Sequence, residues 1–224
     1  MSLSAYEEER KARIQHNQRK LDELGLGGDR AALIEPSAKR TKRLLKAQKA
    51  DRDFVLAAVQ QDWRAIQYAA QSLKEDHEIV LAAVHQDWRA IQYAAAPLKA
   101  DSEVVLAAVR QDARALYSAA ESLKADRETM LAAVTQDGSM LRLASEPLRE
   151  DREIVMAAVK QGARLLRFAA NSLKADREIV MAAVTQDGSA LQFAAETLRA
   201  DREFMLAAVK QGARLLRFAA NSLK

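Results

Sequence analysis

Aspartate recurs along this chain at a constant interval of 25 residues. The aspartates that share this spacing are Asp51, Asp76, Asp101, Asp126, Asp151, Asp176 and Asp201. Each one opens a copy of the approximate pattern D-R-E-Φ-V-L-A-A-V-x-Q-D-x-R-x-L-x-F-A-A-x-S-L-K-A, in which Φ is apolar, and seven copies fill residues 51–224. A fixed period between 20 and 50 residues is the signature of a solenoid of stacked units. The spacing therefore predicts seven tandem copies of one supersecondary unit.

Each copy contains the signals of two short helices. The opening aspartate is an N-cap acceptor, and the run from position 4 to position 9, such as Phe54 to Val59, is apolar enough for a helix buried on several sides. Position 12, which is usually aspartate, begins a turn, and apolar residues at positions 15, 16, 18, 19 and 20 predict a second helix. Helices of this length persist only when neighbours bury them. We therefore predict an all-α fold, an α-solenoid of seven 25-residue helix-turn-helix repeats.

Two recurrent side chains in each copy have simple structural interpretations. Aromatic residues at position 18 are spaced as core residues; they are Tyr68, Tyr93, Phe168, Phe193 and Phe218. A glutamine occupies position 11 in all seven copies, and we predict a ladder of glutamines that satisfies turn backbone groups between copies. Serine, threonine or proline at position 22, as in Pro97 and Pro147, predicts a tight turn before the next copy.

The copies resemble a known family. The string A-A-V-x-Q-[DN]-G/W-x-x-L-x-[YF]-A, which recurs through residues 51–224, is similar to an uncharacterised tandem repeat catalogued as a domain of unknown function and abundant in algae and protists. The resemblance implies a helical repeat array and a eukaryotic microbial source. It brings no activity, cofactor or catalytic residue to this chain. Trp63, Trp88 and the glycines at position 12 depart from the family's usual turn, which indicates a specialised surface there.

The front of the chain differs from the repeats in charge. Residues 1–50 hold 12 Lys and Arg against 7 Asp and Glu, whereas residues 51–224 hold 23 and 24. A capping box and a thin apolar stripe predict an N-terminal helical extension. We predict that residues 1–36 form this helix and a linker, that residues 37–50 form a basic capping helix, and that residues 51–224 form the solenoid.

A basic patch lies within the predicted capping helix and consists of Lys39, Arg40, Lys42 and Arg43. Such a patch suits a nuclear import receptor or a phosphate backbone, but we favour the simpler interpretation, a solvated basic helix face, because short basic runs are common and unspecific. The preceding segment Tyr6–Leu26 is similar to a short segment that opens some plant and algal nuclear proteins. These features keep a nucleic-acid or chromatin association open as the alternative function.

Nothing in the sequence supports catalysis. The chain has no cysteine, which excludes thiol catalysis, zinc-thiolate sites and iron–sulfur clusters. Its three histidines, His16, His77 and His85, do not have ligand spacing on one helix, and we interpret His77 and His85 as surface residues. An enzyme made of seven similar copies would need one copy that differs chemically, and none does. We therefore predict no catalytic residue, no cofactor site and no metal site.

The sequence also bears on location. No run of 18 apolar residues is present, so we predict no membrane span. The polar, acidic start argues against a signal peptide. We expect an intracellular protein, either cytoplasmic or nuclear, and leave an organelle open.

Two sets of side chains are candidates for partner binding. Trp63 and Trp88 occupy position 13 of adjacent copies, so we predict that they lie side by side, either binding a partner or covered by the N-terminal helix. Arginines at positions 14 and 17 of one copy face outward together because they are three residues apart. The arginine pairs of this kind are Arg164 with Arg167 and Arg214 with Arg217.

The leading hypothesis is a non-enzymatic scaffold or linker that binds protein partners within a larger assembly. The seventh copy has no polar capping repeat after it, which favours a partner at that end or a longer parent chain. The nucleic-acid alternative would use the basic patch and the arginine pairs. The near-neutral repeats argue against it, because a dedicated nucleic-acid solenoid is basic along its binding face.

Overall fold

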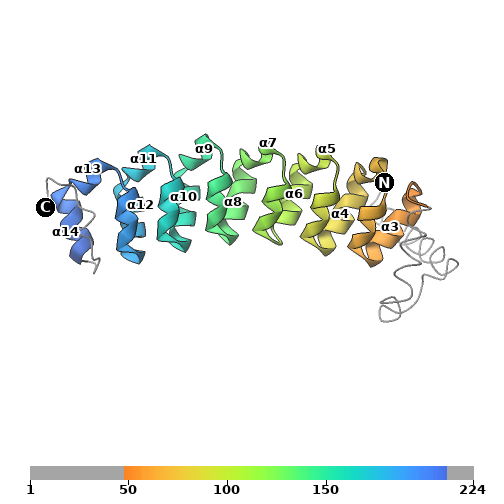
Figure 1. Cartoon of the computed structure of the whole chain (residues 1–224), viewed down its shortest axis with the longest axis horizontal. Helices are drawn as coiled ribbons and strands as arrows, with labels where there is room; N and C mark the ends of the chain where they lie inside the picture. The colour runs from red at the N-terminus through yellow and green to blue at the C-terminus, as the bar shows by residue number, and fades with distance from the viewer. Residues whose placement is uncertain (1–47, 211–224) are drawn as a thin grey trace, which may run out of the picture. The chain divides into compact units, whose positions relative to one another are not determined.

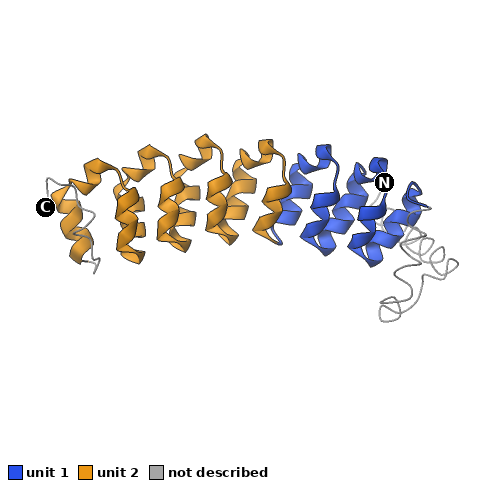
Figure 2. Cartoon of the chain, in the orientation of Figure 1, with its two compact units in different colours: residues 1–111 blue, residues 112–224 orange. Residues whose placement is uncertain are grey.

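The computed structural model describes residues 48–210, and each element within that range is a helix (Figure 1). The chain divides into two compact units, residues 1–111 and residues 112–224 (Figure 2). The helix and linker predicted over residues 1–36, most of the predicted capping helix and the second half of the seventh repeat lie outside the described residues. Within residues 48–210, no helix is both long and apolar enough to cross a membrane.

Each of the first six repeats supplies a long α-helix, then a six-residue 3-10 helix, then a four-residue helix. Unit 1 contains α3 (Arg52–Gln61), η1 (Trp63–Tyr68), η2 (Gln71–Lys74), α4 (His77–Gln86), η3 (Trp88–Tyr93), α5 (Ala96–Lys99) and α6 (Ser102–Val109). Unit 2 contains η4 (Ala113–Ser118), α7 (Glu121–Lys124), α8 (Arg127–Gln136), η5 (Gly138–Leu143), α9 (Glu146–Arg149), α10 (Arg152–Gln161), η6 (Ala163–Phe168), α11 (Asn171–Lys174), α12 (Arg177–Gln186), η7 (Gly188–Phe193), α13 (Glu196–Arg199) and α14 (Arg202–Lys210). In each unit the long helices lie side by side, and the four-residue helices follow one end of that row (Figure 1). The chain is thus a helical repeat solenoid, as predicted.

The long helices form as the sequence predicts. The Asp51 carboxylate accepts the N–H of Phe54 at 3.0 Å, and the opening aspartates of the other described repeats cap their helices in the same way. Positions 4, 5, 8 and 9 face the core; in α4 they are Ile79, Val80, Ala83 and Val84, all 0% exposed. Burial on two sides stabilises a helix that would be marginal alone.

The second helix of each repeat is a 3-10 helix, which differs from the helix-turn-helix unit predicted from the sequence. In η4, the residues at positions 13, 16 and 19, Ala113, Leu116 and Ala119, are buried, while Arg114 and Tyr117 at positions 14 and 17 are exposed. Side chains three residues apart eclipse one another in a 3-10 helix. Positions 13, 16 and 19 therefore form a buried row with a period of three, and Ala115 at position 15 is buried beside it. A search for a period of 3.6 does not detect that row.

In both units, backbone bonds to the preceding repeat follow the ends of 3-10 helices. Ala95, at position 20, has extended backbone with φ −68° and ψ 161°, and its N–H donates to the carbonyl of Lys74 at 2.9 Å. The equivalent bonds from Ala170 to Arg149 and from Ala195 to Lys174 measure 3.0 and 2.8 Å. Because this N–H is used between repeats, it is not available to continue the helix.

A four-residue helix then replaces the tight turn predicted at position 22. Pro97 and Pro147 lie in the first turn of α5 and α9, where the missing N–H costs no helical bond. The leucine at position 23 points into the core, as Leu98 does at 8% exposure.

The glutamine ladder is confirmed within both units. Gln86 donates from Nε2 to the carbonyl oxygen of Val59 at 2.6 Å, and its Oε1 accepts the N–H of Trp63 at 3.2 Å. Gln161 makes the same two bonds to Val134 and Gly138, at 2.6 and 2.7 Å. Each amide thus bonds a carbonyl near the C-terminal end of the preceding long helix and an N–H at the N-terminal end of the preceding 3-10 helix. Backbone groups at helix ends have no partner inside the helix.

A second ladder joins arginines to the helix starts of the following repeat, and the sequence did not predict it. The Arg52 guanidinium contacts Asp76 and Glu78, each at 2.7 Å. The other arginines in the ladder, with their partners, are Arg127 to Asp151 and Glu153, Arg152 to Asp176 and Glu178, and Arg177 to Asp201. His77, predicted to be a surface residue, takes the same place in its repeat, 3.7 Å from Asp101 and 3.5 Å from Glu103.

The ladder changes the titration of the capping aspartates. Burial by itself would raise the pKa of Asp76, but hydrogen bonds from the Arg52 guanidinium and the Ile79 N–H outweigh it and hold that pKa below its ordinary value. The pKa values of Asp151 and Asp176 are lowered by the same balance of burial against backbone and arginine donors.

The position-18 residues are not core residues in the described repeats. Tyr68, Tyr93, Phe168 and Phe193 are half-buried, because the 3-10 geometry turns position 18 away from the face that carries positions 13, 16 and 19.

Gly138 is a point of close approach between repeats. A Cβ added there would lie 2.8 Å from Cδ1 of Leu165 and 3.1 Å from the carbonyl oxygen of Ala158. We expect Gly138→Ala to lower the free energy of unfolding by about 1–3 kcal/mol, because the packed neighbours must move. Leu165→Ala should reduce that cost by about 1 kcal/mol in the double variant. Urea unfolding followed by circular dichroism measures both.

Gly162→Ser is the matched control for Gly138→Ala. Its backbone is extended, the nearest atoms to an added Cβ are 3.6 Å away, and serine caps a helix. We expect this variant to unfold within about 1 kcal/mol of the wild type. Equal destabilisation by the two variants would contradict the close approach at Gly138.

The lowered aspartate pKa values predict acid lability. The unfolded chain takes up protons near the ordinary aspartate pKa of about 4, before the folded chain does, so stability falls as the pH drops from about 5 through that range. We expect Asp76→Asn/Asp151→Asn/Asp176→Asn to be less stable at pH 7, although asparagine still caps the helices. Its melting temperature should then fall less steeply between pH 5 and pH 3. If the melting temperatures of the variant and the wild type fell equally steeply between pH 5 and pH 3, the ladder's contribution to the pH dependence of stability would be contradicted.

Candidate functional site

The outer face of the 3-10 helices carries side chains in two rows. Positions 14 and 17 lie one turn apart, about 6 Å along a 3-10 helix, and both point to solvent. The arginines of the described repeats that occupy these rows are all exposed; they are Arg64, Arg89, Arg114, Arg142, Arg164 and Arg167. The prediction that positions 14 and 17 face outward together is confirmed.

In unit 1 the rows border an aromatic surface, which we define as Trp63, Arg64, Trp88, Arg89 and Tyr93. The Arg64 guanidinium lies 5.0 Å from the centre of the Trp63 ring, and that of Arg89 lies 5.1 Å from the centre of the Trp88 ring. Both tryptophans are half-buried, so a face of each ring system remains accessible. Stacked guanidinium and indole groups combine an apolar area with hydrogen-bond donors.

The tryptophans are in neighbouring 3-10 helices, as predicted, but the ring that meets Trp63 belongs to Tyr93. The two ring centres are 6.4 Å apart and the planes are tilted by 40°. Tyr93 is at position 18 of the next repeat, so the aromatic surface is continuous across η1 and η3. The predicted N-terminal helix that would cover the tryptophans lies outside the described residues.

Carboxylates neutralise the arginines of the aromatic surface. Arg64 lies 3.4 Å from Asp62, and Arg89 lies 3.0 Å from Asp87. Each aspartate also accepts the backbone N–H of the arginine and so caps the 3-10 helix. The aromatic surface is therefore close to electrically neutral.

In unit 2 the rows form a guanidinium surface, which we define as Tyr117, Arg142, Arg164, Arg167 and Phe168. Arg142 lies over the Tyr117 ring, 5.1 Å from its centre, and donates to the tyrosine hydroxyl. Arg167 lies over Phe168 at 4.5 Å. Tyr117 is 46% exposed, because the third repeat carries its aromatic residue at position 17.

A glycine changes the charge of the guanidinium surface. Gly162 stands at position 12, where Asp112 holds Arg114 at 2.6 Å in the third repeat. Arg164 therefore has no carboxylate in its own turn and reaches Asp187 of the next repeat at 3.7 Å, with its side chain 71% exposed. Among residues 48–210, no carboxylate lies within 4 Å of the Arg142 or Arg167 guanidinium.

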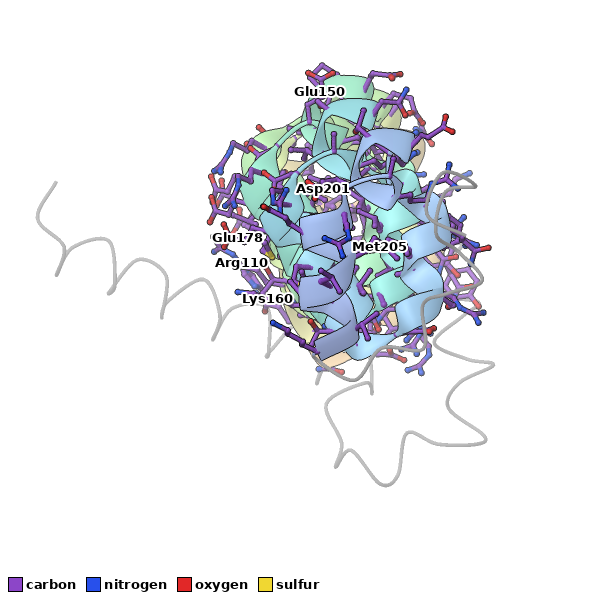
Figure 3. All side chains as sticks on the ribbon, turned by 90° about the vertical axis from the view of Figure 1, so that its left-hand side faces the viewer. Arg110, Glu150, Lys160, Glu178, Asp201 and Met205 are labelled. Carbon is purple, nitrogen blue, oxygen red and sulfur yellow. The ribbon has the colours of Figure 1, made fainter. Side chains whose placement is uncertain are left out.

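The long helices carry an open groove on their own face. It lies between α12 and α14, has a volume of about 680 Å³, and is lined by Arg177, Glu178, Met181, Ala182, Thr185, Gln186 and Phe204. On α14, Leu206 and Val209 are 48% and 44% exposed. In the end view of Figure 3, Glu178 and Lys160 lie on the same side of unit 2, whereas Met205 lies nearer the middle of the unit.

The structure brings together some of the predicted site residues and leaves others outside its description. Trp63 and Trp88 share the aromatic surface, and Arg164 and Arg167 share the guanidinium surface. Arg214, Arg217 and the basic patch of Lys39, Arg40, Lys42 and Arg43 lie outside the described residues.

Sequence reasoning identified Arg142 as an outward-facing arginine at position 17 but missed Tyr117 and the contact between the two. The signal was available in part, because both occupy position 17 of adjacent copies. The groove had no sequence signal, since Met181 and Phe204 follow the common apolar pattern. Within residues 48–210, no group of three or more His, Asp or Glu side chains is arranged to hold a metal ion.

Comparison with known families identifies the repeats. A family model described as a domain of unknown function, DUF4116, matches residues 51–99, 126–174 and 176–224. The chain belongs to this family of tandem helical repeats. The matches cover two 25-residue copies each, so the family's unit is a pair of the repeats described above. Neither the curated proteins nor the solved structures contain a match to the chain.

The guanidinium surface should contribute little to folding. Arg142, Arg164 and Arg167 are exposed, so we expect each arginine-to-glutamine variant to unfold within about 0.5 kcal/mol of the wild type. Trp63→Ala should cost about 1 kcal/mol or more, because it removes half-buried apolar area and the ring contact with Tyr93. Urea midpoints measure the difference. A loss above about 2 kcal/mol for an arginine variant would make the surface structural instead.

Proposed function

We propose that the protein is a non-enzymatic helical repeat scaffold that binds protein partners through the outer face of its 3-10 helices. The observation that carries the proposal is the aromatic surface of unit 1. Tryptophan, tyrosine and arginine are the residue types enriched at the energetic centres of protein interfaces. Here two half-buried tryptophans, a tyrosine and two stacked arginines lie on neighbouring repeats.

The repeat architecture supports this proposal physically. In unit 1 the glutamine ladder joins η1 to the following repeat, and position-20 backbone bonds join η1 and η3 to the segment that precedes their own repeat. The exposed side chains therefore stand on a preorganised frame, and a partner that binds them loses little entropy from ordering the surface.

The charge distribution favours a protein partner over nucleic acid at the aromatic surface. Asp62 and Asp87 neutralise the two arginines there. A nucleic-acid surface gains most of its affinity from unneutralised cations along phosphates.

Affinity capture with the full chain as bait, from an extract of the source organism with and without nuclease, tests the proposal. We expect a stoichiometric protein partner that survives nuclease and is lost with Trp63→Ala/Trp88→Ala. Thr135→Ala, an exposed change on α8, is the control and should retain the partner. Circular dichroism of each bait establishes that it is folded.

Two results would contradict the proposal. One is a set of captured proteins that is the same for the tryptophan variant and the control. The other is co-purifying nucleic acid that is lost with Lys39→Gln/Arg40→Gln/Lys42→Gln/Arg43→Gln, which would make the basic patch the binding region.

A further inference from the structure

We propose that the guanidinium surface of unit 2 binds an extended acidic peptide segment of a partner protein. The inference rests on the proposed scaffold function, and it names the partner's chemistry at a second surface. It is carried by three exposed arginines on adjacent 3-10 helices, η5 and η6, between two aromatic rings; among residues 48–210, Arg142 and Arg167 have no carboxylate within 4 Å. Arg142 lies over Tyr117, Arg167 lies over Phe168, and Arg164 stands one turn before Arg167.

The charge of this surface arises from one substitution in the repeat. The position-14 arginines Arg64, Arg89 and Arg114 each contact an aspartate at position 12 of their own turn. At Gly162 that carboxylate is replaced by hydrogen, and Arg164 is left with Asp187 at 3.7 Å. From Gln161 to Lys174 the chain has three basic residues and no acidic one. A local excess of positive charge follows, although residues 112–210 hold 14 Lys and Arg against 15 Asp and Glu.

The aromatic rings restrain the guanidinium groups without neutralising them. A guanidinium stacked on a ring keeps the N–H groups at its edges free to donate, and those groups match a carboxylate in pairs. Restraint of the side chain reduces the entropy lost on binding. The exposed ring of Tyr117 adds apolar area beside the charge.

The dimensions of the surface suit an extended peptide. Arg164 and Arg167 are one 3-10 turn apart, about 6 Å along the helix axis. Arg142 and Arg167 hold the same position in adjacent repeats, and packed helices are about 8–10 Å apart. A chain in the extended polyproline II conformation makes one turn in three residues and advances about 9 Å, so side chains three residues apart share one face. Carboxylates three residues apart on such a chain can therefore meet arginines of successive repeats.

Nucleic acid fits this surface less well than an acidic peptide does. The rows do not continue as a basic stripe, because Ser139, Ser189 and Gln192 occupy the other positions of η5 and η7 in the two rows.

Fluorescence anisotropy with the full chain tests the proposal directly. The probe is a fluorescein-labelled nonapeptide with glutamate at its first, fourth and seventh residues and serine elsewhere; the neutral probe has glutamine in place of glutamate. We expect saturable binding of the acidic probe, weakened by added salt, and no binding of the neutral probe. Arg164→Gln/Arg167→Gln should weaken binding of the acidic probe about tenfold or more.

Gly162→Asp is the sharpest variant, because it restores the carboxylate that other repeats hold at position 12 while every arginine remains. Its backbone accepts any residue, and aspartate caps the 3-10 helix, so the fold should be unharmed. We expect about a fivefold or greater loss of affinity for the acidic probe. Asn171→Asp is the matched control, since it adds the same charge in the same repeat, at a position where other repeats carry glutamate. It should change the affinity less than about twofold.

The outcomes separate the possibilities. Equal binding by the wild type and Gly162→Asp, or no binding of the acidic probe by the wild type, would overturn the proposal. Tighter binding of a 12-nucleotide single strand that depends on Arg164 and Arg167 would overturn it in favour of nucleic acid. None of these results bears on partner capture through Trp63 and Trp88, so the two proposals fail independently.

Discussion

The two hydrogen bonds made by the side-chain amide of the position-11 glutamine are the interactions on which the rest of the repeat structure depends. One side chain donates to the last turn of the preceding long helix and accepts from the first turn of the preceding 3-10 helix, as Gln161 does with Val134 and Gly138. Both backbone groups are buried or nearly so, and leaving such groups without partners costs about 1–3 kcal/mol each. The bond pair also fixes the angle between the two helices of a repeat, and with it the direction of the exposed rows.

Much of this fold was predictable because the repeat amplifies each signal seven times. The aspartate caps, the bounds of the long helices and the role of the glutamine all follow from residue types at fixed positions. The 3-10 helices and the four-residue helices were not predictable from the apolar pattern. Ala95 shows the reason: its N–H bonds to Lys74 of the preceding repeat, and a contact between copies decides where the local helix ends. The arginine ladder, as between Arg52 and Asp76, was missed for the same reason.

The two candidate surfaces were also predictable only in part. Outward-facing arginines were predictable from spacing, and the tryptophans from their rarity among the copies. The sequence pattern did not reveal which arginines lack a carboxylate in their own turn, because that depends on the residue two positions earlier. It also did not reveal which arginines lie over aromatic rings. Small residues thus have large effects in this array: Gly138 admits Leu165, and Gly162 leaves Arg164 without a carboxylate in its own turn. The paired repeats of the DUF4116 family can in this way keep one frame and vary one surface.

The glutamine at position 11 holds the preceding repeat in place, as Gln161 does in unit 2. Hydrogen exchange of the native full chain, read at the Gly138 amide, tests it most directly, because that N–H donates to Gln161 Oε1. We predict that Gln161→Leu speeds exchange at Gly138 and in the last turn of α8 by about tenfold or more. The reason is that the Gly138 N–H loses both its hydrogen-bond acceptor and its shielding from water. Gln60→Leu, which changes an exposed side chain, should leave both unchanged. Unaltered exchange at Gly138 in Gln161→Leu would contradict the claim.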